Sequence, residues 1–289
     1  MKIIFFLSII LCLLNVNKVS AKEFVVKHYQ KQERYLYGAQ LLELALKKTG
    51  KPYKIVVPED QEVNEGRGEL MVINGEYDLQ FHSTTREREQ KMIPVKIPVY
   101  RGVLGLRLLL VKKNNLSKIS GISDLSTLRS YTGGHGKFWG DLPVYKENNL
   151  DVVTNVKYEG LFKQLIEGRF HYFHRGLNEI WDEQERYAKD LVIADNIMLF
   201  YKHPVYFFVT KKRPELATLL EQGLKVALED GSYKQHFLNY MGKFIKKADL
   251  ASRKLVVLKN PVVPENTNKL DTSWWLPKQH QQTLLRAGL

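Results

Sequence analysis

The stretch NGEYDLQFHSTTRER, residues 74–88, sets the fold class because it leads the chain out of a helix and into a strand. Residues 69–73 have the composition of a helix end, and the Asn74-Gly75 pair breaks that helix with a turn. Tyr77-Asp78-Leu79 then opens a β-strand. A strand that follows a helix in this way favours an α/β fold over a sandwich or a helical bundle.

The same alternation continues on both sides of this stretch. Towards the N-terminus, strands are expected at residues 23–29 and 53–57, around a helix at 34–48 that ends before Gly50 and Pro52. Towards the C-terminus, the expected elements are a long apolar strand at 102–112, helices at 161–168 and 177–188 with a short strand between them, an extended run at 203–210 and a helix at 214–228. The whole chain therefore has an α/β pattern.

The N-terminus predicts secretion. Lys2 precedes an unbroken run of apolar and small residues at 3–14, and Val19-Ser20-Ala21 has the small or β-branched residues typical of a signal-peptidase site. The apolar run is too short to span a bilayer. We expect residues 1–21 to be a cleaved signal peptide and the mature protein to be periplasmic.

Composition narrows the function classes. The net charge is +13, which in a secreted protein favours acidic ligands or surfaces over nucleic acid. The basic residues are dispersed along the chain, so a basic surface that only aids solubility is the alternative. Cys12 is the only cysteine and lies in the signal peptide, so the mature chain has no thiol nucleophile or thiolate metal site. The sequence has no GxSxG or HExxH motif. His171 and His174 have the spacing of a helical metal pair, but the aromatic residues around them indicate a strand, so neither a metal nor a cofactor is expected.

Several short motifs keep a specific order along the chain: residues 74–79, 84–88, 98–100, 122–125 and 230–232 followed by Phe237. In this order they resemble the family 3 periplasmic solute-binding proteins of amino-acid ABC transporters. A variant branch of that superfamily, found as stand-alone secreted proteins, is similar to the chain at residues 134–141, 158–162, 168–170, 175–179 and 258–261. The resemblance covers nearly all of the mature chain.

The resemblance implies a two-lobed α/β fold of the type II periplasmic-binding-protein kind, with two hinge strands and a discontinuous first lobe. Residues 22–108 plus 208–250 would form lobe 1 and residues 109–207 would form lobe 2. Residues 251–289 would be an extended C-terminal tail, pinned to a lobe by Trp274 and Trp275. The ligand would bind between the lobes, and closure would be a hinge motion about the two strands.

Arg88 is the first candidate ligand-binding residue. In the amino-acid binders that the chain resembles, an arginine at this position forks the ligand's α-carboxylate, and the spacing Thr85-x-x-Arg88 matches it. Ser83 and Thr85 offer hydroxyls on the same segment, and His82 directly precedes them. The structural alternatives are an ordinary surface arginine and a histidine with a packing role.

The second lobe contributes His171 and Arg175. The resemblance implies an aspartate at position 171 that pairs with the ligand's ammonium, but this chain has a histidine there. Together with Arg175, His171 predicts a basic edge and a preference for anionic ligands such as dicarboxylates or acidic sugars. The alternative is that the histidine is satisfied elsewhere and the pocket has decayed.

Four further residues complete the predicted site. His135 lies in Gly134-His135-Gly136, which is expected to open a helix whose N-terminus binds an anion. Trp139 and Tyr29 are interpreted as aromatic walls of the site or as core packing. Arg107 interrupts an apolar strand, and a buried arginine needs an acidic residue or the ligand as its partner.

The leading hypothesis is a monomeric, non-enzymatic solute-binding protein. It would capture a small anionic or zwitterionic, carboxylate-bearing ligand, for import through an ABC permease or for presentation to a membrane sensor. Two alternatives stay open. One is a ligand-free scaffold or partner-binding protein that kept the fold, and the other is an unrecognised hydrolase or lyase that uses His171, His135 and a carboxylate.

Overall fold

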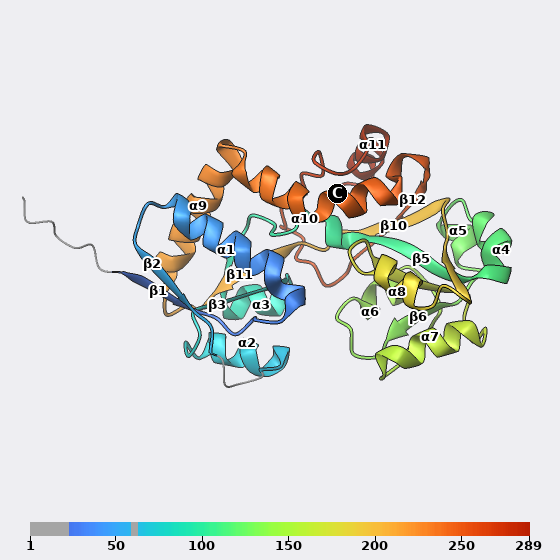
Figure 1. The fold of residues 1–289 in the computed structure, drawn as a ribbon, viewed down its shortest axis with the longest axis horizontal. Helices are drawn as coiled ribbons and strands as arrows, with labels where there is room; N and C mark the ends of the chain where they lie inside the picture. The colour runs from blue at the N-terminus through green and yellow to red at the C-terminus, as the bar shows by residue number, and fades with distance from the viewer. Residues whose placement is uncertain (1–22, 59–62) are drawn as a thin grey trace, which may run out of the picture.

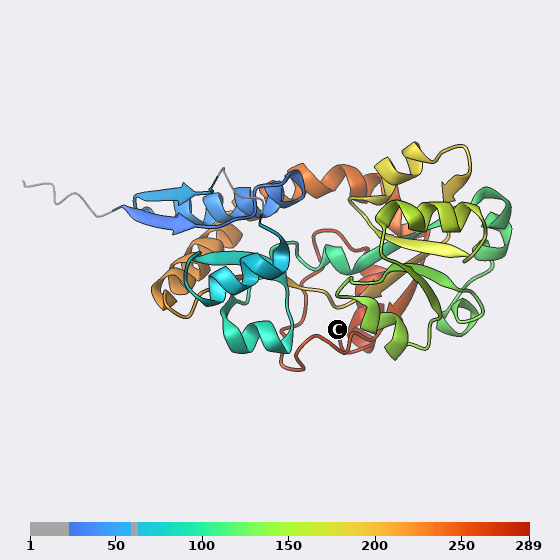
Figure 2. The ribbon, with the colours of Figure 1, turned by 90° about the horizontal axis from the view of Figure 1, so that it is seen from below.

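The computed structural model describes residues 23–58 and 63–289 and shows two α/β lobes side by side along the long axis of the molecule (Figures 1 and 2). The predicted signal peptide, residues 1–21, lies outside the described residues. Within the two described ranges, no helix combines the length and the apolar character needed to cross a membrane. The two-lobed α/β fold class predicted from the sequence is confirmed.

The first lobe contains two small sheets. In one, β1 (Phe24–Lys27) pairs in parallel with β2 (Tyr53–Val56). In the other, β11 (Val205–Val209) lies antiparallel between β3 (Leu79–Ser83) and β4 (Ile93–Val95). Because β11 follows the second lobe in sequence, the first lobe is discontinuous.

Helices α1 (Leu36–Lys48) and α9 (Pro214–Glu229) pack closely in the first lobe. A Cβ at Gly223 would lie 2.0 Å from the carbonyl oxygen of Ala45, so only glycine permits this approach. The other helices of this part are α2 (Glu65–Ile73), α3 (Arg86–Lys91), α10 (Ser232–Ala248) and the 3-10 helices at Glu33–Tyr35 and Val103–Gly105.

The second lobe is built on one sheet with the strand order β12-β10-β5-β8-β6-β7, and β9 pairs with β5 beside this path. Its strands are β5 (Leu106–Lys112), β6 (Gly133–Gly136), β7 (Val152–Asn155), β8 (Tyr172–Gly176), β9 (Leu191–Ile193), β10 (Ile197–Tyr201) and β12 (Lys254–Leu258). Its helices are α4 (Leu116–Ser120), α5 (Leu125–Leu128), α6 (Leu142–Glu147), α7 (Tyr158–Ile166) and α8 (Ile180–Arg186), with 3-10 helices at Lys113–Asn115 and Leu250–Ser252. The central strand β5 starts at the lobe junction.

Over residues 23–58 and 63–289 the chain crosses between the lobes three times, where the sequence predicted two crossings. Residues 100–105 lead into β5 and residues 202–204 lead from β10 to β11. The third crossing is α10, after which β12 pairs in parallel with β10 of the second lobe. At the far end of α10, Lys247 lies 4.6 Å from the ring centroid of Trp181 in α8.

The C-terminal residues are not extended throughout, so that part of the sequence prediction is wrong. The alternating residues of β12 bury Val256 and Leu258 against the second lobe, and amphipathic residues near the C-terminus form α11 (Lys278–Arg286). Trp275 is 4% exposed, and its indole Nε1 donates a hydrogen bond to the carbonyl of Arg101 at 3.0 Å. The C-terminal residues therefore belong to the folded body of the protein.

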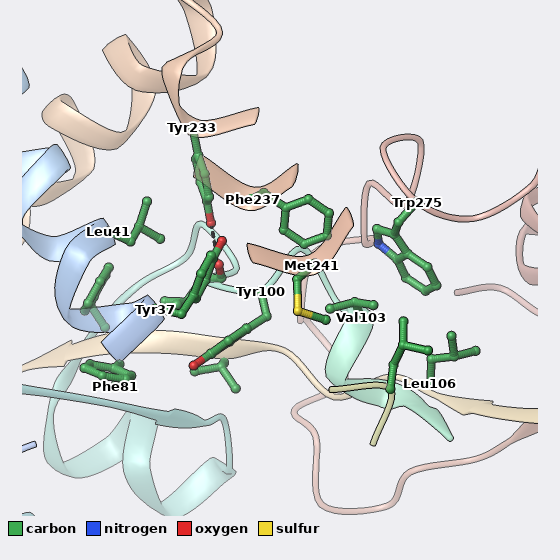
Figure 3. Packing of buried hydrophobic residues seen from close by; sticks show 14 of the residues in the cluster. Tyr37, Leu41, Phe81, Tyr100, Val103, Leu106, Tyr233, Phe237, Met241 and Trp275 are labelled. Carbon is green, nitrogen blue, oxygen red and sulfur yellow. Dashed lines mark hydrogen bonds between the residues drawn. The ribbon is translucent and has the colours of Figure 1, made fainter. Parts of the chain in front are cut away.

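One apolar core continues from the first lobe into the junction (Figure 3). Tyr233 of α10 donates its hydroxyl to the carbonyls of Pro98 and Val99, at 2.6 and 2.9 Å. Further along α10, Phe237 and Met241 lie near Trp275 in the same cluster. The region between the lobes is thus closely packed along this face of α10.

Candidate ligand-binding site

Two adjoining cavities lie between the lobes, one of about 700 Å³ and one of about 290 Å³. Of the residues that the structure describes, four line both of them: Arg34 from the first lobe, Arg107 from the start of β5, and Asn178 and Glu179 from the loop after β8. A cleft lined from both lobes is the usual location of a ligand site in an α/β protein of this shape. These four shared residues mark its centre.

The backbone at Gly176 is the point on which three of these side chains converge. A Cβ placed there would lie 2.9 Å from Glu179 Oε2, 3.1 Å from Arg107 Nη1 and 3.3 Å from Asn178 Oδ1. Gly176 stands directly opposite Arg107 in the pairing of β8 with β5, and its N–H donates to Glu179 Oε2 at 3.1 Å. A cation, a carboxylate and an amide thus meet above a position that has no side chain.

Arg107 has the acidic partner that the sequence predicted for it. Its Nε donates to the hydroxyl of Tyr201 at 2.6 Å, and its Nη2 donates to Asp141 Oδ2 at 3.0 Å. Burial would lower the pKa of Arg107, but Tyr201 and Asp141 outweigh that effect and raise it. Arg107 is therefore a fixed cation with one nitrogen, Nη1, turned towards Gly176.

Asp141 is ionised although it is buried. Burial would raise the pKa of its carboxyl, but the adjacent imidazole of His135 and the charge of Arg107 outweigh burial and hold the pKa well below its usual value. His135 Nε2 lies 3.2 Å from Asp141 Oδ1. His135 belongs to strand β6 and is fully buried, so the prediction that Gly134-His135-Gly136 opens an anion-binding helix is wrong. The imidazole therefore stabilises the ionised carboxylate of Asp141.

Arg175 points into the larger cavity, but its charge is already neutralised. Its guanidinium carbon lies 5.0 Å from the ring centroid of Trp139 and 4.9 Å from that of Phe173. Nε donates to both oxygens of Glu183, at 2.7 and 2.9 Å, and Nη2 lies 3.0 Å from Glu179 Oε2. Trp139 therefore is a wall of the cavity, as one of the sequence interpretations had it, and it also packs on Phe173.

Arg88 lies outside the lining of both cavities. Its Nε donates to Glu69 Oε2 at 2.8 Å and its Nη1 donates to the carbonyl of Ser83 at 2.8 Å. Thr85 is the N-cap of α3, where its hydroxyl accepts the N–H of Arg88 at 3.1 Å. The spacing Thr85-x-x-Arg88 therefore has a helix-capping role here, and the predicted carboxylate fork is not supported.

The other first-lobe candidates are divided between the smaller cavity and the core. His82 and Ser83 line the smaller cavity. Tyr29 lies behind them, where its hydroxyl donates to Gln80 Oε1 at 2.8 Å and lies 3.1 Å from His82 Nε2. Its ring fills the space above Gly68, at which a Cβ would clash, so Tyr29 is a core residue.

His171 is remote from the cleft. It lies just before β8, whereas Arg175 and Gly176 lie at the other end of that strand. Its Nδ1 accepts the N–H of Thr132 at 3.0 Å, and its ring packs edge-on against Tyr131. The prediction that His171 creates a basic edge of the site is therefore contradicted by its position.

The sequence interpretation missed the acidic half of the site. The basic residues that line the larger cavity are Arg34, Arg107, Arg175 and Arg186, and the acidic ones are Glu33, Asp141, Glu179, Asp182 and Glu183. Burial would raise the pKa of Glu179, but Arg175 and Arg107 outweigh it and lower the pKa, so this carboxylate is ionised. Charges of both signs line the cavity in nearly equal number. The signal that could have found them is the recurrence of Glu179 and Glu183 after Arg175.

His174 completes the lining with a neutral group. It is 1% exposed, and its ring stacks on Tyr145 with centroids 4.1 Å apart. Burial, followed by the neighbouring His135, holds the pKa of His174 well below its usual value. The floor of the larger cavity is therefore uncharged at this residue.

No protein-family model and no curated protein matches the sequence. Solved structures do match. The YckB protein of Bacillus subtilis has 16% identity and a TM-score of 0.53, over 81% of this chain and 96% of the YckB chain. A binding component of an ABC transporter from Wolinella succinogenes, complexed with lysine, has 18% identity and a TM-score of 0.52, over 75% of this chain and 95% of its own.

The GluR0 ligand-binding core from Nostoc punctiforme, in complex with L-glutamate, is a third match. It has 14% identity and a TM-score of 0.50, over 75% of this chain and 98% of its own. At these identities the likeness concerns the fold. The chain therefore has the two-lobed α/β fold, of the type II periplasmic-binding-protein kind, in common with these solved structures.

Proposed function

We propose that this chain is a secreted, non-enzymatic solute-binding protein that captures a small zwitterionic ligand between its lobes. It would deliver the ligand to an ABC permease or present it to a membrane sensor. The observation that carries this proposal is the convergence of Arg107, Asn178 and Glu179 above Gly176, where the two cavities meet. The fold likeness to a transporter component complexed with lysine and to a ligand-binding core in complex with L-glutamate supports the same class of function.

Each of the three converging groups has a separate task in this proposal. Arg107 is held by Tyr201 and Asp141, and its remaining nitrogen Nη1 would donate to a carboxylate of the ligand. Glu179 is ionised and would accept from an ammonium group. Asn178 has both a donor and an acceptor and would bind either group. Because protein contacts already fix Arg107, its ordering costs little when the ligand binds.

The charge balance of the larger cavity favours a zwitterion over a purely anionic ligand. Arg175 is neutralised by Glu183 and Glu179, and Arg107 is paired with Asp141. A dicarboxylate would bring two negative groups to a wall that already carries ionised carboxylates, and unpaired charge in a partly desolvated site is costly. Of the two ligand classes expected from the sequence, the zwitterionic one is therefore proposed.

A thermal-shift screen tests the ligand class. The mature protein is heated with neutral and basic amino acids, dicarboxylates, sugar acids and phosphorylated compounds. A ligand at about 100 times its Kd stabilises the folded state by about 2.7 kcal/mol, which is readily seen as a rise in Tm. Zwitterions are expected to raise the Tm. A rise with dicarboxylates or acidic sugars alone would contradict the proposal.

Titration calorimetry then tests the role of Glu179. Glu179→Gln should weaken the binding of a zwitterionic ligand by at least about tenfold, because the ammonium group of the ligand loses its charged partner. Glu221→Gln is the matched control, since Glu221 pairs with Lys225 on the exposed face of α9. An unchanged affinity in Glu179→Gln would mean that Glu179 does not bind the ammonium group of the ligand.

A second candidate is a ligand-free scaffold or partner-binding protein. The observation that favours it is that two of the predicted ligand-binding arginines already pair with carboxylates of the protein, Arg88 with Glu69 and Arg175 with Glu183. A screen in which no compound stabilises the protein would favour this candidate. Turnover of a stabilising compound would favour the hydrolase or lyase alternative.

A further inference from the structure

We infer that residues 260–276, which we call the hinge clasp, bind two of the three connections between the lobes and hold the lobes in the arrangement of this structure. This inference concerns the free energy of lobe closure, so it goes beyond the proposed ligand binding and does not depend on it. The clasp follows β12 and runs along the lobe junction before α11 (Figures 1 and 2).

The first connection is held at a turn with unusual backbone angles. Arg101 has φ +51° and Gly102 has φ +80°, a left-handed pair that a non-glycine residue rarely adopts without support. Arg101 is 7% exposed, pairs with Asp271 and lies 4.3 Å from the ring centroid of Trp274. Its carbonyl accepts the indole N–H of Trp275 at 3.0 Å. The clasp therefore fixes both the side chain and the backbone of this turn.

The second connection is held by the same segment. Lys202, between β10 and β11, donates its Nζ to the carbonyl of Thr267 at 2.6 Å. The carbonyl of Lys202 accepts from Asn260 Nδ2 at 2.9 Å. Burial lowers the pKa of Lys202. Two connections that are distant in sequence are thus bound to one continuous segment.

The clasp is also anchored to the lobes on either side. On the first-lobe side, Trp274 packs on Tyr233 and Phe237 of α10, with ring centroids 5.5 and 5.8 Å apart. On the second-lobe side, the side chain of Asn148 bonds both the N–H and the carbonyl of Lys259, just before the clasp. Trp275 and Met241 belong to the same apolar cluster (Figure 3). The clasp is therefore attached to both lobes and cannot move with one of them alone.

Hinge closure requires changes of φ and ψ at a few connecting residues. Here those residues are the ones that the clasp holds, so closure must break or stretch its contacts. The clasp therefore acts as a restraint that ligand binding has to overcome.

Distance measurements without ligand test this inference. Nitroxide labels are placed at Glu43→Cys on α1 and Lys163→Cys on α7, both of which are exposed. Cys12 is the only native cysteine, so the protein expressed without its predicted signal peptide carries no other label. Double electron–electron resonance should give one narrow distance distribution. Asp271→Asn and Asn260→Ala, singly and combined, should broaden it at least about twofold, because the lobes are then free to populate other arrangements.

Controls keep the result interpretable. Glu221→Gln removes an exposed ion pair far from the hinge and should leave the distribution unchanged. Trp274→Leu should give the largest broadening; if it does not fold, as judged by circular dichroism, the two polar variants carry the test. The inference is overturned if the folded clasp variants keep the wild-type distribution, or if the wild-type distribution is already broad. A failed ligand screen would leave this measurement unaffected, so the two proposals fail separately.

Discussion

Replacing Asp141 by asparagine should destabilise the protein, because Arg107 would remain as a buried cation without its counter-charge. The side chains of Arg107 and Asp141 are 13% and 10% exposed. Breaking a buried ion pair by removing one partner costs about 3–5 kcal/mol, and the retained amide oxygen places Asp141→Asn near the lower end, at about 3 kcal/mol. Arg107→Met together with Asp141→Leu should recover part of that loss, since the pair is then replaced by apolar groups.

Urea unfolding followed by circular dichroism measures this change. The pH dependence provides a second readout, because the folded pKa of Asp141 is held below its unfolded value. The contribution of Asp141 to stability is complete above its unfolded pKa and is lost as the pH falls through its folded pKa. The free energies of unfolding of wild type and Asp141→Asn should therefore become equal at strongly acidic pH. The exposed-pair variant Glu221→Gln should lose less than about 1 kcal/mol. A loss below about 1 kcal/mol in Asp141→Asn would refute the assignment of a desolvated pair.

Two further predictions follow from the site. Arg88→Ala should leave ligand affinity within about twofold of wild type in calorimetry. Its free energy of unfolding should fall by about 1–3 kcal/mol, because Glu69 loses its partner. A large loss of affinity would instead place Arg88 in the ligand site. Burial lowers the pKa of both His28 and His203 to about 4. The unfolded chain takes up these protons near pH 6.5, so the free energy of unfolding should be highest above that pH and fall towards pH 4. The fall should be shallower in His203→Gln. Equal slopes of stability against pH in the two proteins would contradict the burial of His203.

The fold was largely predictable from the sequence because its main signals are local. The apolar strand around Arg107 forms the central strand of the second lobe, and the Asn74-Gly75 break precedes β3. What the sequence could not place was β12, because a five-residue strand near the C-terminus gains its stability only from pairing with β10. The third crossing between the lobes follows from that pairing and was missed for the same reason.

The site was less predictable because its residues meet only in three dimensions. The spacing of Thr85 and Arg88 suits both a carboxylate fork and a helix cap, and the fold uses it as a cap. His171 and Gly176 lie close in sequence, but the extended strand β8 separates them, so only Gly176 reaches the cleft. Arg107 was identified because a lone charge in an apolar strand demands a partner. Glu179 follows β8 in a polar loop, and its spacing after Arg175 is a weaker signal than that lone charge.

Binding of the best ligand from the thermal-shift screen to Gly176→Ala tests the central claim most directly. A methyl group at this position would crowd Glu179 and Arg107 at 2.9 and 3.1 Å, which shifts the two side chains without straining the backbone. Gly242→Ala is the matched control, because a Cβ there has no neighbour within 4 Å. Calorimetry should show at least about tenfold weaker binding for Gly176→Ala, equal to about 1.4 kcal/mol, and unchanged binding for Gly242→Ala. Wild-type affinity in a folded Gly176→Ala protein would contradict the claim that the ligand binds where Arg107, Asn178 and Glu179 converge.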